Sequence, residues 1–240
     1  MDYSPILAVA TAAFEIIVAG RALSGLKRAP GERRIVWTTG AILLLLAAYQ
    51  LAEVAICSDV AMAGFLPRLA FVIVTWLPPL GLLLIAQLRY PRSRLSDRAA
   101  YAMLAVAAAI VAWIVVDRSF ATASVCNAVY ARYTHAMPRF RIYAWFYWLG
   151  LAAMAALSGR GAMTCRQERR RRQLAQVFAG TTGFVGLSML TSWFVEPAPG
   201  ALPSIMCHFA LLLAICLARV VQLERRTPAE ASGTIASQAG

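Results

Sequence analysis

Charged side chains are scarce in this chain of 240 residues, of which they make up only 14%. Hydrophobic residues account for 60%, against about 45–50% in an ordinary soluble domain. This balance excludes an intrinsically disordered chain and argues against a soluble enzyme. Lysine is almost absent, because Lys27 is the only one among the 23 basic residues and all the others are arginines. This use of arginine, together with many alanines, suggests a GC-rich bacterial genome.

Residues for several membrane-embedded chemistries are also missing. A retinal protein needs a lysine amine inside the bundle for its Schiff base. Lys27 lies in a predicted loop, so retinal is excluded, and no cofactor is predicted. The two histidines, His135 and His208, are too few for a three-histidine zinc site, and no metal site is predicted. Walker loops, nucleophile elbows and Cys-x-x-Cys pairs are absent from the sequence, so no catalytic residue is predicted and an enzyme is not the favoured class.

Long apolar runs dominate the chain. There are seven of them, each 17 to 23 residues long, which as a helix crosses a hydrocarbon core of about 30 Å. None alternates with a period of two, so a membrane barrel is excluded. We therefore predict an all-α fold, a polytopic seven-helix transmembrane bundle over residues 1–226 with a disordered cytoplasmic tail over residues 227–240. The predicted helices span residues 6–26, 35–57, 69–88, 99–116, 142–158, 174–195 and 203–221.

The basic residues predict the orientation of this bundle. With loops on alternating sides, 18 of the 23 basic residues lie on the side of the C-terminus and 5 on the other. The positive-inside rule then places the N-terminus outside and the C-terminus in the cytoplasm, as a multi-pass protein of the inner (plasma) membrane. The arginine run within residues 166–172 would lie beside anionic lipid headgroups at the cytoplasmic face. No nucleic-acid partner is expected, because the basic residues do not form one stripe.

Ionisable residues inside the apolar runs point to a site, because such groups are costly in a membrane. Tyr49, Glu53 and Cys57 are spaced four residues apart and share one face of the second helix. His208 lies near the same, outer end of the last helix. Glu53 fits two interpretations equally: a ligand or proton site, or a structural hydrogen bond between helices. Glu15, near the middle of the first helix, is a second intramembrane carboxyl.

Aromatic residues and prolines extend this candidate site. Tyr143 and Tyr147 share a face of the fifth helix that can turn inward, although their cluster also fits an aromatic belt at the membrane surface. Pro78 and Pro79 predict a kink in the third helix, which frees carbonyl groups toward a cavity. We therefore expect an outward-facing pocket for a small ligand, lined by Tyr49, Glu53, Trp76, Tyr143, Tyr147 and His208.

The cysteines predict one disulfide, between Cys57 and Cys126. Both lie on the predicted external side, which is oxidising in bacteria. Cys207 is external too, but it sits inside a helix and is expected to be a packed thiol. Cys165 and Cys216 fall on the cytoplasmic side and deep in the last helix.

Three classes of function remain open. The first, which we favour, is a receptor-like membrane protein that binds a small ligand from outside; its short tail would require a separate signalling partner or a homo-oligomer. The second is a small transporter that is proton-coupled through Glu53 or Glu15. The third is an intramembrane enzyme or cofactor-binding protein that uses the two histidines.

Overall fold

The computed structural model describes residues 5–24, 33–58, 65–89, 94–126, 131–135, 139–194 and 202–225. Lys27 and the predicted tail over residues 227–240 lie outside these described residues. The elements in chain order are α1 (Ile6–Ser24), α2 (Arg33–Cys57), α3 (Leu66–Thr75), α4 (Leu77–Leu88), α5 (Arg94–Val116), β1 (Ala121–Cys126), β2 (Ala131–His135), α6 (Arg139–Thr164), α7 (Glu168–Phe194) and α8 (Leu202–Arg225).

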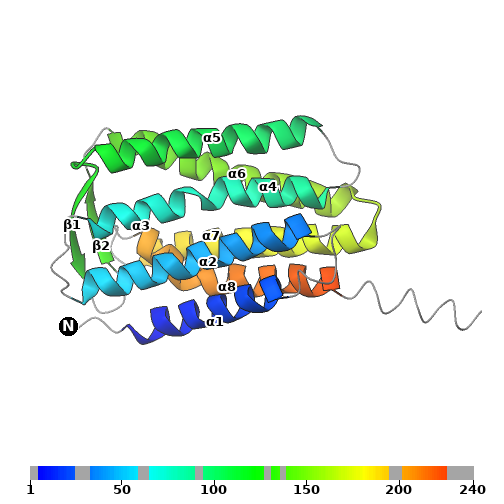
Figure 1. Ribbon diagram of the computed structural model, residues 1–240, viewed down its shortest axis with the longest axis horizontal. Helices are drawn as coiled ribbons and strands as arrows, with labels where there is room; N and C mark the ends of the chain where they lie inside the picture. Colours follow the sequence, from blue (N-terminus) through cyan, green and yellow to red (C-terminus); the bar gives the residue numbers. More distant parts are fainter. Residues whose placement is uncertain are drawn as a thin grey trace, which may run out of the picture.

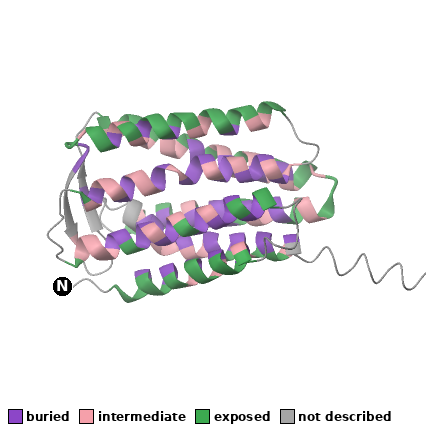
Figure 2. Ribbon diagram, viewed as in Figure 1, coloured by how far each residue is buried: buried purple, intermediate pink, exposed green. Residues whose placement is uncertain are grey.

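The seven-helix bundle predicted from the sequence is confirmed. Among the described residues, seven helical stretches are long and apolar enough to cross a membrane, and α3 with α4 makes one of them. Figure 1 shows the helices lying side by side, with α5 at one edge of the bundle and α1 at the opposite edge. The buried residues concentrate on α2, α3, α4 and α8, whereas much of α5 and α1 is exposed (Figure 2).

Two helices extend well beyond the apolar runs that predicted them. Helix α6 continues to Thr164, and α7 begins at Glu168 rather than at residue 174. The first turns of α7 are helical because Glu168 forms ion pairs with Arg171 and Arg172, three and four residues later. The arginine run is therefore largely part of a helix and not of a loop.

The predicted kink in the third span is a break in the helix at Trp76, between α3 and α4. Pro78 and Pro79 lie in the first turn of α4, where a helix does not need the N–H groups that proline lacks. The helix resumes where the Leu80 N–H donates to the Trp76 carbonyl oxygen at 3.1 Å. Helices α3 and α4 are thus the two halves of one span, and the break between them is a single residue long.

The segment between α5 and α6, for which the sequence indicated only a long loop, contains a hairpin. Strands β1 and β2 pair antiparallel, with Cys126 opposite Ala131. The side chains of Phe120, Ala121 and Tyr133 are buried against the bundle. Figure 1 shows the hairpin across the end of the bundle where α2 ends and α3 begins, which we call the hairpin end.

At the opposite end of the bundle, α1, α4, α6 and α8 end and α2, α5 and α7 begin (Figure 1). Most of the described arginines lie at this end. We call it the arginine end. The arginines in or next to these helix termini are Arg21, Arg33, Arg34, Arg89, Arg94, Arg98, Arg160, Arg166, Arg169, Arg170, Arg171, Arg172, Arg219 and Arg225.

Candidate functional site

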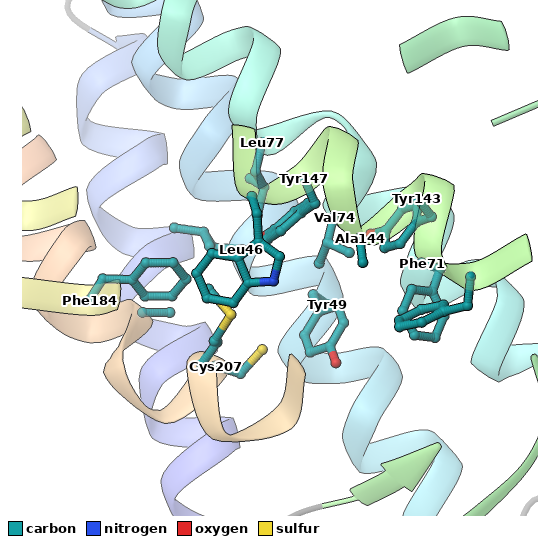
Figure 3. A pocket seen from close by; sticks show the side chains of 14 residues that line it. Leu46, Tyr49, Phe71, Val74, Leu77, Tyr143, Ala144, Tyr147, Phe184 and Cys207 are labelled. Carbon is teal, nitrogen blue, oxygen red and sulfur yellow. The ribbon is translucent and has the colours of Figure 1, made fainter. Parts of the chain in front are cut away.

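A cavity of about 220 Å³ lies in the hairpin half of the bundle. Side chains from α2, α3, α4, α6, α7 and α8 surround it, and nearly all of them are aromatic or aliphatic (Figure 3). The lining residues are Leu46, Tyr49, Phe71, Val74, Leu77, Phe140, Tyr143, Ala144, Tyr147, Trp148, Phe184, Met206, Cys207 and Ala210.

The structure brings three of the six predicted pocket residues to this cavity: Tyr49, Tyr143 and Tyr147. The other three, Glu53, Trp76 and His208, are not among its lining residues. Trp76 occupies the helix break directly before Leu77, which does line the cavity. His208 follows the lining residue Cys207 on α8 and is half-buried, and Glu53 is buried one turn from Tyr49. The cavity is consequently more apolar than the sequence indicated.

An aromatic cluster centred on Phe71 closes the cavity toward the hairpin. The ring of Phe71 meets four other rings edge-on, those of Phe120, Tyr133, Phe140 and Tyr143, with centroid separations of 5.3 to 5.9 Å. Edge-to-face contacts at these separations are favourable beyond the area that they bury. This cluster escaped the sequence analysis because Phe71 sits in a uniformly apolar run and Phe120 and Tyr133 in a segment without a helical period.

The Tyr49 side chain presents its ring to the cavity and its hydroxyl to the hairpin. The hydroxyl oxygens of Tyr49 and Tyr133 are 3.3 Å apart, within hydrogen-bonding distance. In Figure 3 the Tyr49 hydroxyl points away from Leu46 and Phe184 on the far side of the cavity. A buried phenol needs such a partner, so this pair fixes β2 over the cavity and keeps the cavity wall apolar.

Cys57 and Cys126, which the sequence analysis paired, lie at disulfide distance with Cα atoms 5.7 Å apart. The link joins the end of α2 to the end of β1 across a sequence separation of 69 residues. Since α2 also supplies Leu46 and Tyr49 to the cavity, this link holds the hairpin to the helix that forms one cavity wall.

A second group of side chains, buried and polar, lies between α1, α2 and α8. The Gln50 side-chain N–H donates to the Cys207 carbonyl oxygen at 2.7 Å. Glu53 is 1% exposed and Glu15 is 0% exposed. Within the described part of the chain, neither carboxyl oxygen of Glu15 has a hydrogen-bond partner.

A third polar cluster lies at the arginine end, between α7 and α8. Arg170 pairs with Glu224 at 2.8 Å, and the Gln173 side-chain amide donates to the same carboxylate at 2.6 Å. The Arg170 guanidinium also donates to the Gln173 amide oxygen at 2.9 Å, and Gln173 donates to the Val220 carbonyl. The arginine run as a whole was expected to face lipid headgroups; Arg170 instead has only 14% of its side chain exposed and is bound to a buried carboxylate.

No group of three or more His, Cys, Asp or Glu side chains that could hold a metal ion occurs in the described ranges. His135 belongs to β2, but its side chain is outside what the structure describes, so its joint role with His208 stays a prediction. Comparison of the chain with protein-family models, with curated proteins and with solved structures gave no match.

Proposed function

We propose that this protein is an integral membrane protein of the bacterial inner membrane, with the hairpin end outside and the arginine end in the cytoplasm. Its seven spans and the exposed apolar side chains on α1 and α5 support insertion into lipid. The gathering of arginines at one end supports the orientation, through the positive-inside rule. In this orientation the N-terminus and the hairpin are external.

We further propose that the protein binds a small hydrophobic ligand in the cavity, from the external half of the membrane. The observation that carries this proposal is the cavity itself, which has a volume of about 220 Å³ and is lined mainly by aromatic and aliphatic side chains of six helices. Protein interiors are close-packed and seldom leave voids larger than a water molecule. An apolar cavity of about 150 Å³ is already enough to bind benzene, so this cavity suits a small aromatic or branched hydrocarbon group.

The lining favours a neutral ligand group. Ionisable carboxyl and imidazole groups are missing from its described lining, since Glu53 and His208 are not part of it. The rings of Tyr147 and Phe184 and the Leu46 side chain gather around the same space in Figure 3. A flat ring or a hydrocarbon chain can contact these side chains without leaving a polar group unpaired.

The arrangement favours binding over passage through the bundle. Toward the arginine end the neighbouring void, lined by Gly81, Leu84 and Met154 among others, holds only about 20 Å³. The hairpin and its aromatic cluster cover the other end. A cavity that does not continue through the bundle suits a receptor-like protein, which passes its ligand-bound state to a partner, better than it suits a transporter.

The test fills the cavity without changing the charge of the protein. Ala144→Leu and Ala210→Leu add bulk at two lining positions, and Ala152→Leu makes the same change on the exposed face of α6. In lipid nanodiscs, 2-bromonaphthalene should quench the fluorescence of Trp148 saturably in the unchanged protein. We expect each filled variant to lose about tenfold in affinity or more, equivalent to ~1.4 kcal/mol, and Ala152→Leu to keep it.

Trp148→Phe identifies the source of the signal. It should remove the saturable quenching while leaving the fluorescence of the remaining tryptophans. Equal, non-saturable quenching in all variants would show partition into lipid and would overturn the proposal. Mass spectrometry of compounds that copurify with the protein, and are lost in Ala144→Leu, would then identify the natural ligand.

We also propose that anionic phospholipid headgroups bind at the arginine end. A groove there is lined by Arg33, Arg34, Trp37, Thr38, Gln87 and Tyr101. Basic pockets between helices on the cytoplasmic side are suited to such headgroups, and tryptophan and tyrosine are typical of the interface. The double variant Arg33→Gln/Arg34→Gln should retain less phosphatidylglycerol in native mass spectrometry than Arg160→Gln/Arg166→Gln, a matched loss of two exposed charges at the same end of the bundle. Equal retention would contradict the proposal.

A further inference from the structure

Glu15 is the most unusual side chain of the bundle. It is the central residue of α1 and is 0% exposed, although its neighbours Ile16 and Ile17 are largely exposed. Helix α1 packs against α2 and α8, so the carboxyl is buried where these three helices meet. A carboxyl in the middle of a membrane span is expensive, and a neutral residue would fill this place at lower cost.

The groups around Glu15 do not compensate a negative charge. The buried polar residues in the hairpin half of α2 are Tyr49, Gln50 and the second carboxyl, Glu53; the Gln50 side-chain N–H already donates to the Cys207 carbonyl oxygen. On α8, Cys207 is buried and the half-buried His208 follows it. Among the described residues, no hydrogen bond or ion pair reaches the Glu15 oxygens.

A buried carboxylate without a partner costs far more free energy than the neutral acid, so such a group takes up a proton instead. Even the neutral acid loses the hydrogen bonds that water would give it, which is unfavourable for an unsatisfied buried group. The site is therefore stable only while the proton stays bound. It becomes unstable once the proton leaves, unless α1 moves so that water reaches the carboxylate.

We propose that Glu15 is a proton-binding site inside the bundle, occupied while α1 packs against α2 and α8 and released to water when α1 moves away from them. The Glu15 carboxyl gives its proton to a water molecule and remains as a carboxylate in the hydrated state. The α1 helix is thus the moving element of a proton-driven conformational change. The proposal does not depend on the ligand of the cavity, although α8 lines the cavity through Cys207 and also packs against α1.

Dicyclohexylcarbodiimide, a hydrophobic reagent that attacks protonated carboxyls from the lipid, is the first probe of this site. With the full chain in nanodiscs, peptide mass spectrometry should find the adduct on Glu15 at neutral pH. Above the midpoint of its titration, labelling should fall about tenfold per pH unit, in step with the protonated fraction. Glu15→Gln should abolish this adduct, whereas Glu53→Gln, the matched change on α2, should leave it.

Hydrogen exchange of the α1 amides, corrected for intrinsic chemistry and compared with the α2 amides, tests the coupled motion. Exchange in α1 should rise at alkaline pH in the unchanged protein and stay low in Glu15→Gln, which remains neutral at every pH. If the reagent fails to reach the site, infrared spectra should still show a protonated carboxyl band that Glu15→Gln removes. Absence of that band, or equal α1 exchange in both proteins across the pH range, would overturn the proposal.

Discussion

One glutamate is buried at the interface between α7 and α8, and another is buried where α1 packs against α2 and α8. The two differ in their hydrogen-bond partners. Glu224 of α8 receives hydrogen bonds from Arg170 and Gln173, so its charge is fully compensated. Glu15 of α1 has none within the part of the chain that the structure describes. Polar groups that are completely satisfied make an interface rigid, whereas an unsatisfied group stores free energy that a movement can release.

The glycines of these helices show the same contrast. A Cβ atom on Gly180 or Gly183 of α7 would come within 3.0 Å of side chains of α8. A Cβ atom on Gly20 of α1 would meet nothing within 4 Å. The small residues of α7 thus permit close helix contact, and α1 has no equivalent at that position. The α1–α2 interface has its own close contact, because a Cβ atom on Gly40 of α2 would lie 3.1 Å from the Leu23 side chain of α1. We therefore infer that α7 and α8 form a rigid pair, and that the unsatisfied Glu15 carboxyl, rather than loose packing, is what favours movement of α1.

Glu224→Leu should have the largest effect on the stability of the bundle. It leaves the Arg170 guanidinium and the Gln173 amide without their buried acceptor, at a cost of roughly 3 kcal/mol in the apparent free energy of unfolding. Denaturation in mixed detergent micelles measures this loss. Glu168→Leu removes an exposed partner of Arg171 and Arg172 and should cost less than about 1 kcal/mol. Similar losses of unfolding free energy in the two variants would show that the buried pair of Glu224 stabilises the protein no more than the exposed pairs of Glu168 do.

Gly180→Ala should be next in size. The new methyl group would lie 2.9 Å from the Cys216 Cβ atom, which cannot rotate away, and overpacking of this kind costs about 1–3 kcal/mol. Gly186 of the same helix has nothing within 4 Å of its Cβ position, so Gly186→Ala should leave stability unchanged or raise it by up to about 1 kcal/mol. The same detergent titration checks both, and equal responses would show that α7 and α8 are not closely packed.

Glu15→Leu should act in the direction opposite to Glu224→Leu. It replaces an unsatisfied buried carboxyl by an apolar side chain of similar size, and we expect a gain of about 1–2 kcal/mol. The variant should also lose the alkaline destabilisation expected of the unchanged protein, in which ionised Glu15 favours the separated α1. Detergent titrations at neutral and alkaline pH measure both effects. A loss as large as that of Glu224→Leu would mean that Glu15 is a structural residue.

The membrane helices could be predicted from the sequence because length and apolarity alone define them. The Cys57–Cys126 contact followed from the side on which each residue falls, a simple consequence of the helix count. The hairpin could not be predicted, because strand pairing depends on partners that the bundle supplies, such as Phe71 beneath Tyr133. Three of the six residues predicted for the pocket line the cavity. The sequence shows that Tyr143 and Tyr147 share one helix face, but residue spacing does not show whether the Glu53 side chain reaches the cavity.

Asp117 provides the smallest and last test, because it is a carboxyl outside the spans that has the partners Glu15 lacks. The Ser119 hydroxyl and backbone N–H donate to it at 2.6 and 3.0 Å, and Arg139 pairs with it at 3.0 Å. These hydrogen bonds, Ser119 first and Arg139 next, hold the pKa of Asp117 below its ordinary value of 3.8. The pair therefore helps to fix the start of α6 to the end of α5.

In the unfolded chain Asp117 takes up a proton as the pH falls through its ordinary pKa, whereas in the folded chain it stays ionised to a lower pH. Its stabilising contribution is therefore complete above pH 3.8 and is lost as the pH falls through the folded-state pKa, so stability rises with pH in that window. Asp117→Asn keeps an acceptor for Ser119 but cannot ionise, and its unfolding midpoint should depend less on pH there. Because the partner Arg139 has 58% of its side chain exposed, water screens this pair and the change should be small. An unchanged dependence of the unfolding midpoint on pH would show that the screening is complete, and that only the buried carboxyls Glu15 and Glu224 distinguish the two interfaces.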